Sequence, residues 1–212
     1  MPFTLSGNGG TVAEVDGTVW RSMRTTVRPP EYSSGGYYSM WMNAVTAAAP
    51  AALAELASFR WGSATLICLV QKVTLIASVT VASTAGEVVL GAFVARGFTA
   101  SDSAGTAVTL TGNAFKKRTS LPTTAVTDAR FAAGGVLTAG TRTADGQAFA
   151  QAHGGFSAFG PGPAMSFDAT GPNGYPIVLA QNEGLVFRNV VALTTAVYQY
   201  SIGIEWAEVA AY

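Results

Sequence analysis

A strict alternation near the end of the chain constrains the fold more than any other feature. Between residues 198 and 206 every second side chain is apolar, and the residues between them are polar or small. A side-chain period of two is typical of a β-strand with one buried face and one wetter face. The apolar set is Tyr198, Tyr200, Ile202, Ile204 and Trp206. We therefore expect these five side chains to face the core together.

Further strands are predicted along the chain, and two pairs of them look like hairpins. The first pair is the long alternating segment at 64–82 and the segment at 88–100. The second pair, 176–180 and 185–189, flanks a polar Asn-Glu-Gly turn at 182–184. Short apolar strands around such a turn are typical of a hairpin. Many short strands with Gly and Pro turns predict an all-β fold, an antiparallel β-sandwich of jelly-roll type.

One segment favours a helix. Residues 46–56 read TAAAPAALAEL and are rich in Ala and Leu, which are strong helix formers. Pro50 interrupts the hydrogen bonding of a helix and limits it to about two turns. The predicted sandwich therefore carries one short helix.

The domain organisation is predicted to be simple. Sandwiches of about 200 residues are often single domains, and the sequence shows no repeat and no linker of changed composition. Residues 1–17 are rich in Gly, Ser and Thr with few apolar residues, so we expect an extended N-terminal arm. Residues 18–212 are then the β-sandwich domain.

The charge content is unusually low. Charged residues make up 11% of the chain and hydrophobic residues 49%, whereas about 25% charged is ordinary. No uninterrupted apolar run reaches the roughly 18–20 residues of a membrane-spanning helix, and the N-terminus lacks the pattern of a signal peptide. We therefore expect no membrane partner. Burial of the surface by neighbouring subunits is the better explanation, which predicts an oligomer or a larger assembly.

The charged and reactive residues argue against two other function classes. Lys plus Arg and Asp plus Glu both total 12, so no net positive charge is present to neutralise nucleic-acid phosphates. The single His153 precedes two glycines and is expected to be a loop residue bonded to backbone or water. Glu205 and Glu208 are expected on a solvated edge or in salt bridges to a neighbour. Cys68 lies in an apolar run and is expected to be a small buried residue. No catalytic residue, metal, cofactor or small-molecule substrate is predicted.

Lys116, Lys117 and Arg118 form the only basic run. They lie in a long mixed segment at 101–127, and loops of this length are usually functional or disordered. A solvated loop and an arm that binds an acidic surface on a partner protein explain the run equally well. We therefore take these three residues as the candidate partner-binding site.

The chain also resembles a known group of proteins. The segments PIVLAQNEGLVFRNVVAL, IGIEWAEVAAY, FRWGSATLICLVQKVTL and TAGTRTADGQAFA are similar to uncharacterised structural proteins of tailed bacteriophages. The resemblance covers most of the chain from about residue 37 onward and rests on framework residues. It implies a virion component, most simply a capsid decoration (cement) protein on the outer surface of the head, made in the host cytoplasm. Its partners would be the major capsid protein and copies of itself in a homotrimer, since icosahedral sites favour closed symmetric oligomers.

Two alternatives stay open. The first is a tail- or baseplate-associated protein or a receptor- or glycan-binding module, in which Phe156, Phe159 and Tyr175 would line a shallow site. The second is a β-fold hydrolase that uses Glu or Asp, which lacks a clustered acid and base in the sequence.

Overall fold

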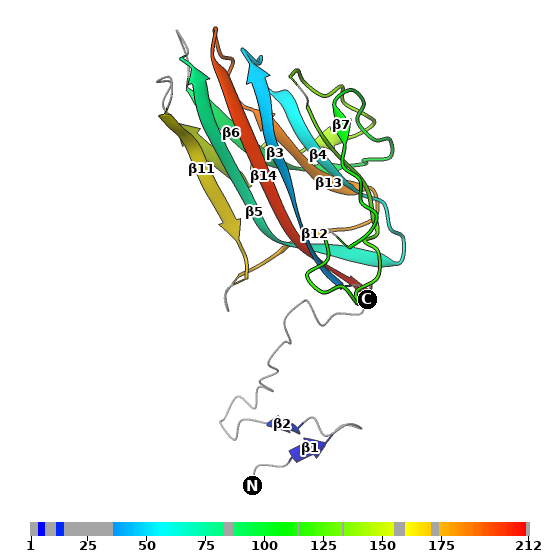
Figure 1. Ribbon diagram of the computed structural model, residues 1–212. Helices are drawn as coiled ribbons and strands as arrows, with labels where there is room; N and C mark the ends of the chain where they lie inside the picture. The colour runs from blue at the N-terminus through cyan, green and yellow to red at the C-terminus, as the bar shows by residue number, and fades with distance from the viewer. Residues whose placement is uncertain are drawn as a thin grey trace.

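The computed structural model describes residues 4–6, 12–14, 36–82, 87–113, 115–132, 134–154, 160–170 and 174–210. These residues form β-strands and no helix. Two antiparallel sheets pack face to face (Figure 1), and their facing side chains form one hydrophobic core. The all-β, sandwich-like prediction is therefore confirmed.

The first sheet, which we name the front sheet, has the strand order β11-β5-β14-β3, and β12 pairs with the same edge of β5 as β11. Figure 1 shows it nearest the viewer. Its strands are β3 (Gly36–Ala48), β5 (Leu66–Val81), β11 (Gly160–Asp168), β12 (Ile177–Leu179) and β14 (Val197–Ala210).

The second sheet, the back sheet, has the order β10-β6-β13-β4-β8-β7, and β9 pairs with β6. Its strands are β4 (Ala54–Trp61), β6 (Val88–Arg96), β7 (Thr106–Ala107), β8 (Val126–Phe131), β9 (Thr143–Ala144), β10 (Ala150–Gly154) and β13 (Glu183–Asn189). From β3 to β6 the chain alternates between the two sheets at every step.

The predicted helix at 46–56 is wrong. Strand β3 continues to Ala48 because it pairs with β14 over its whole length, and β4 already begins at Ala54. Ala49 and Leu53 have φ values of 39° and 58°, so the link between the strands turns too sharply for a helix. The helix preference of Ala and Leu is worth only a few tenths of a kcal/mol per residue, and long-range strand pairing outweighs it.

The predicted strands are present, but the two predicted hairpins are wrong. The segment at 64–82 becomes β5 of the front sheet, whereas the segment at 88–100 becomes β6 of the back sheet. In the same way β12 pairs with β5, while β13 pairs with β4 and β6. These short connections cross from one sheet to the other. A turn that links two sheets uses the same residue types as a turn that closes a hairpin, so the sequence does not distinguish them.

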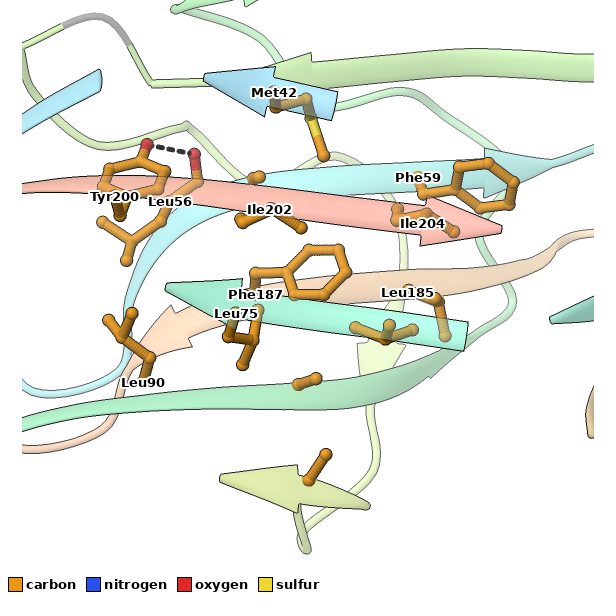
Figure 2. Close-up of a cluster of buried hydrophobic side chains, with 14 of the residues drawn as sticks. Met42, Leu56, Phe59, Leu75, Leu90, Leu185, Phe187, Tyr200, Ile202 and Ile204 are labelled. Atoms are coloured by element: carbon orange, nitrogen blue, oxygen red, sulfur yellow. Dashed lines mark hydrogen bonds between the residues drawn. The ribbon is translucent and has the colours of Figure 1, made fainter. Parts of the chain in front are cut away.

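The central strand β14 supplies the middle of the core, as its alternation predicted. Its five apolar side chains are at most 1% exposed: Tyr198, Tyr200, Ile202, Ile204 and Trp206. Figure 2 shows Ile202 and Ile204 in the same cluster as Leu75 of the front sheet and Phe187 of the back sheet. Cys68 is also fully buried, as expected.

The N-terminal arm falls mostly outside the described residues. Within residues 1–17, β1 (Thr4–Ser6) pairs antiparallel with β2 (Val12–Glu14). The extended arm at 1–17 and the domain at 18–212 therefore remain predictions.

Candidate partner-binding surface

The basic run lies against the outer edge of β3. The amide of Ser39 donates to the carbonyl of Phe115 at 2.8 Å, and the amide of Lys117 donates to the carbonyl of Tyr37 at 3.1 Å. An isolated antiparallel bridge joins Tyr38 to Lys116. The run therefore adds a short strand-like segment to the front sheet, and it covers an edge that would otherwise present unpaired backbone groups.

Lys117 already has a partner within its own chain. Its Nζ lies 3.2 Å from Glu205 Oε2 and 5.6 Å from the centre of the Tyr37 ring. The Tyr37 hydroxyl donates to the same carboxylate oxygen at 3.0 Å. Lys117 and Glu205 are both partly exposed, so solvent screens the pair and the pair contributes little to stability. A partner protein would therefore compete with a weak internal contact at Lys117.

Glu205 and Glu208 do not form the solvated pair that the sequence suggested. They lie on β14, a central strand between β5 and β3. Glu205 lies on the outer face of the front sheet with Lys117, whereas Glu208 is 1% exposed and faces the core. Two carboxylates on opposite faces of a sheet cannot act together on one substrate.

Glu208 instead holds a loop to the end of the core. The Thr124 hydroxyl and the Trp206 indole N–H donate to its Oε1, the latter at 3.1 Å, and the Ala125 amide lies 3.0 and 3.1 Å from its two carboxylate oxygens. Burial raises the pKa of Glu208, although these hydrogen bonds act in the opposite direction. The charge of Glu208 in turn adds to burial in raising the pKa of the Cys68 thiol and of the Tyr38 hydroxyl.

A buried ionic network, which the sequence pattern did not reveal, fastens the loops over the outer face of the back sheet. Arg142 contacts Asp102 at 2.8 Å and also contacts Glu55, and Arg188 contacts Glu55 at 2.6 Å. Burial raises the pKa of Asp102, but hydrogen bonds from Arg142 and Gly140 outweigh it, so the pKa is lowered overall. Two cations and two anions neutralise one another, which is typical of a structural site. Only the tertiary fold brings these residues together.

His153 was expected in a loop, and this prediction is wrong. It lies in β10, with its Nε2 3.2 Å from Gln151 Oε1 and its Nδ1 3.8 Å from Glu87 Oε2. The side chain is more than half exposed. No group of three His, Cys, Asp or Glu side chains that could hold a metal occurs among the residues described above.

The shallow aromatic site considered in the sequence remains a prediction, because only one of its three residues is described. Phe156 and Phe159 lie outside the described residues, and Tyr175 is 88% exposed. Within the described ranges, no helix has the length and apolarity needed to cross a membrane.

The outer face of the front sheet is the most distinctive exposed surface. Trp41 is 48% exposed and Ile76 is 42% exposed, and the other exposed side chains around them are mostly short and uncharged. No described segment crosses this face in the view of Figure 1. Its uncharged members include Ser39, Trp41, Asn43, Thr46, Thr74, Ile76, Ser78, Ala164, Ser166, Val178, Gln199 and Ser201.

Comparisons with known proteins leave the family open. No family model, no curated protein and no solved structure matches the chain.

Proposed function

We propose that the protein is a capsid decoration (cement) protein of a tailed bacteriophage, which binds the assembled head and stabilises it without catalysing a reaction. The sequence resemblance to phage structural proteins supports this function. The strand order of the sandwich is the structural observation that carries it.

The jelly-roll form of the sandwich is part of the proposal. In the front sheet the order is β3-β14-β5-β11, and in the back sheet it is β4-β13-β6-β10. The first and last of these strands in the chain, β3 and β14, are neighbours, as are the second and second-to-last, β4 and β13. Two four-stranded sheets woven in this way are typical of jelly rolls, a fold common among viral capsid and lectin domains. Strands β7, β8, β9 and β12 are additions at the sheet edges.

Two features of the surface support the proposed partners. Low charge and a sheet face that no described segment covers suit a protein that works by contact with neighbours, which we propose are the major capsid protein and two further copies of this chain. The proposed location is the outer surface of the head. Any partner that binds only the assembled shell stabilises it by mass action.

The test is to add purified protein to particles that lack it. We expect saturable co-sedimentation, density on the outer surface of the head in electron microscopy, and release of DNA at a higher temperature. Density on the tail or baseplate would replace the head location with the tail-associated alternative. Absence of binding to any part of the particle would overturn the proposal.

The N-terminal arm provides a second variant for the same assay. We expect a chain lacking residues 1–17 to dissociate from particles faster, while the melting temperature of the free protein changes little. The reason is that this segment has too few apolar residues to bury a core face of its own. Equal retention of both proteins would mean that other segments make the contact.

A further inference from the structure

Trp41 lies flat on the outer face of the front sheet. A Cβ atom added to Gly203, its cross-strand neighbour, would meet Cζ2, Cε2 and Cη2 of the indole at 2.8, 2.9 and 2.9 Å. Nearly equal distances to three consecutive ring atoms mean that the ring lies broadside over Gly203. One indole face therefore covers the glycine backbone, and the other accounts for the 48% exposure of the side chain.

Hydrogen-bonding side chains extend from this ring across the sheet. The cross-strand register places Trp41, Gly203, Thr74 and Ser166 in one row from β3 to β11. With neighbouring strands about 4.8 Å apart, the row is about 14 Å long. The exposed amide of Asn43 lies beside the row on β3, and that of Gln199 lies further along β14, beyond Ser201. The surface is thus an aromatic ring followed by short hydroxyl and amide groups.

The charges bordering the row are already paired. Lys72 lies 3.2 Å from Asp168, and Lys117 lies 3.2 Å from Glu205. All four residues lie toward one end of the face, where Lys72 is opposite both Asp168 and Glu205 in the register. Among the residues that the structure describes, the rest of this face carries no charge, so it matches a neutral ligand with many hydroxyl groups.

We propose that this face binds a neutral carbohydrate, with one pyranose ring stacked on Trp41 and the following sugar units lying along Thr74 and Ser166. A pyranose has an apolar face of C–H groups and a rim of hydroxyls. The apolar face complements an exposed indole, and the hydroxyls complement amide and hydroxyl side chains that both donate and accept. The proposal adds an activity to the capsid function above and does not depend on it.

A second copy of the chain fits this face less well. Specific protein interfaces bury about 800 Å² on each partner around an apolar centre. Trp41 and Ile76 are large exposed apolar side chains in this part of the face, small polar groups surround them, and the exposed Val178 lies apart from them on β12. Self-association through this face is therefore an outcome of the test and not the proposal.

The experiment is a screen of purified protein on an array of neutral glycans, with sulfated glycans as a charged comparison. The neutral glycan that binds best is then titrated in solution while acrylamide quenching of tryptophan fluorescence is followed. Trp61 and Trp206 are fully buried, and Trp20, which lies outside the described residues, is replaced by Phe in every protein used. Bound sugar should then shield Trp41 from acrylamide.

Three variants sharpen the result. Trp41→Ala should weaken binding about tenfold or more because the stacking surface is lost. Gly203→Ala keeps the indole but lifts it from the sheet, so it should also weaken binding. Val136→Ala removes an apolar side chain that is 47% exposed beside the back sheet, where the amide of Leu137 donates to the carbonyl of Glu55, and it should bind like the wild type.

The proposal is overturned if no neutral glycan on the array binds. It is also overturned if all three variants bind equally, or if Trp41→Ala changes the sedimentation coefficient and leaves glycan binding intact. In the last case the face is an interface between copies of the chain.

Discussion

At the scale of single residues, Glu208 shows how a buried charge can close a sandwich. Its carboxylate lies between the sheets and accepts hydrogen bonds from Thr124, Ala125 and Trp206. Glu205 on the same strand instead lies on the outer face and pairs with Lys117. These hydrogen bonds to Glu208 position the loop that enters β8. Burial of the carboxylate costs free energy, which the hydrogen bonds offset in part.

Burial of Glu208 makes a prediction about pH. The native pKa is raised above the ordinary value of 4.5, so the folded state holds the proton more tightly than the unfolded state. Stability contributed by the neutral acid is then lost as pH rises from about 4.5 through the raised pKa. We expect the free energy of unfolding of the wild type, minus that of Glu208→Gln, to fall between pH 4 and pH 8.

Urea unfolding of both proteins at several pH values checks this. Asp102 and Asp168 have lowered pKa values, that of Asp168 about 2. Their contributions to the free energy of unfolding are lost only at more acid pH. These contributions also cancel in the difference, because the wild type and Glu208→Gln both contain the two residues. A difference that stays constant or grows with pH would contradict the prediction.

The two faces of β14 make a second prediction. Ile202 is 1% exposed in the core, and Gln199 is exposed on the outer face. Ile202→Ala should lower the free energy of unfolding by about 2–5 kcal/mol, since it leaves a cavity that the surroundings fill only in part. Gln199→Ala should change it by about 0.5 kcal/mol or less. Equal losses in chemical denaturation would mean that both faces are covered.

At the scale of elements, the basic segment and strand β3 act as one unit. Residues 115–117 pair with residues 37–39 and protect this part of the sheet edge. The sequence placed the basic run in a long connection, and its role in binding a partner stays a prediction. It could not show that Lys117 returns to Glu205, because the two residues are 88 positions apart (205 − 117) and only the fold joins them.

Replacement of all three basic residues tests whether they bind a partner. We expect Lys116→Ser, Lys117→Ser and Arg118→Ser together to slow attachment to particles and to flatten its dependence on salt, because rim charges act mainly on association rate. Stability should fall by about 1 kcal/mol or less, since the Lys117 pair is exposed. Binding is measured by surface plasmon resonance at low and high salt.

Lys72→Ser is the matched control. It also removes a cation from an exposed ion pair on the front sheet, the pair with Asp168, but it leaves the basic run intact. If the control and the triple variant slow attachment equally, the basic run has no special role.

At the scale of the whole molecule, the low charge predicts self-association. Charged residues are 11% of the chain, and the ionic network of Glu55, Asp102, Arg142 and Arg188 uses four of them inside the fold. We expect sedimentation to give a trimer of three 21.7 kDa chains, about 65 kDa. A single species of one chain at every concentration would count against the prediction.

The sequence by itself located strands β5, β6, β12, β13 and β14 and showed which residues of β14 are buried. A period of two follows from the local geometry of a strand with one covered face, so Tyr198 to Trp206 could be assigned without knowing their neighbours. Strand partners are different, because they depend on contacts between distant segments. Turns that enter a hairpin and turns that cross between sheets use the same residues, so β5 and β6 were wrongly paired.

Tertiary structure alone decided the rest. The Ala-rich segment at 46–56 forms the end of β3 and the start of β4, because pairing of β3 with β14 outweighs a weak helix preference. Tertiary structure also placed Glu208 in the core and Glu205 outside, and it laid Trp41 over Gly203. Each outcome depends on which strand lies beside which, and that is fixed by burying the whole core at once.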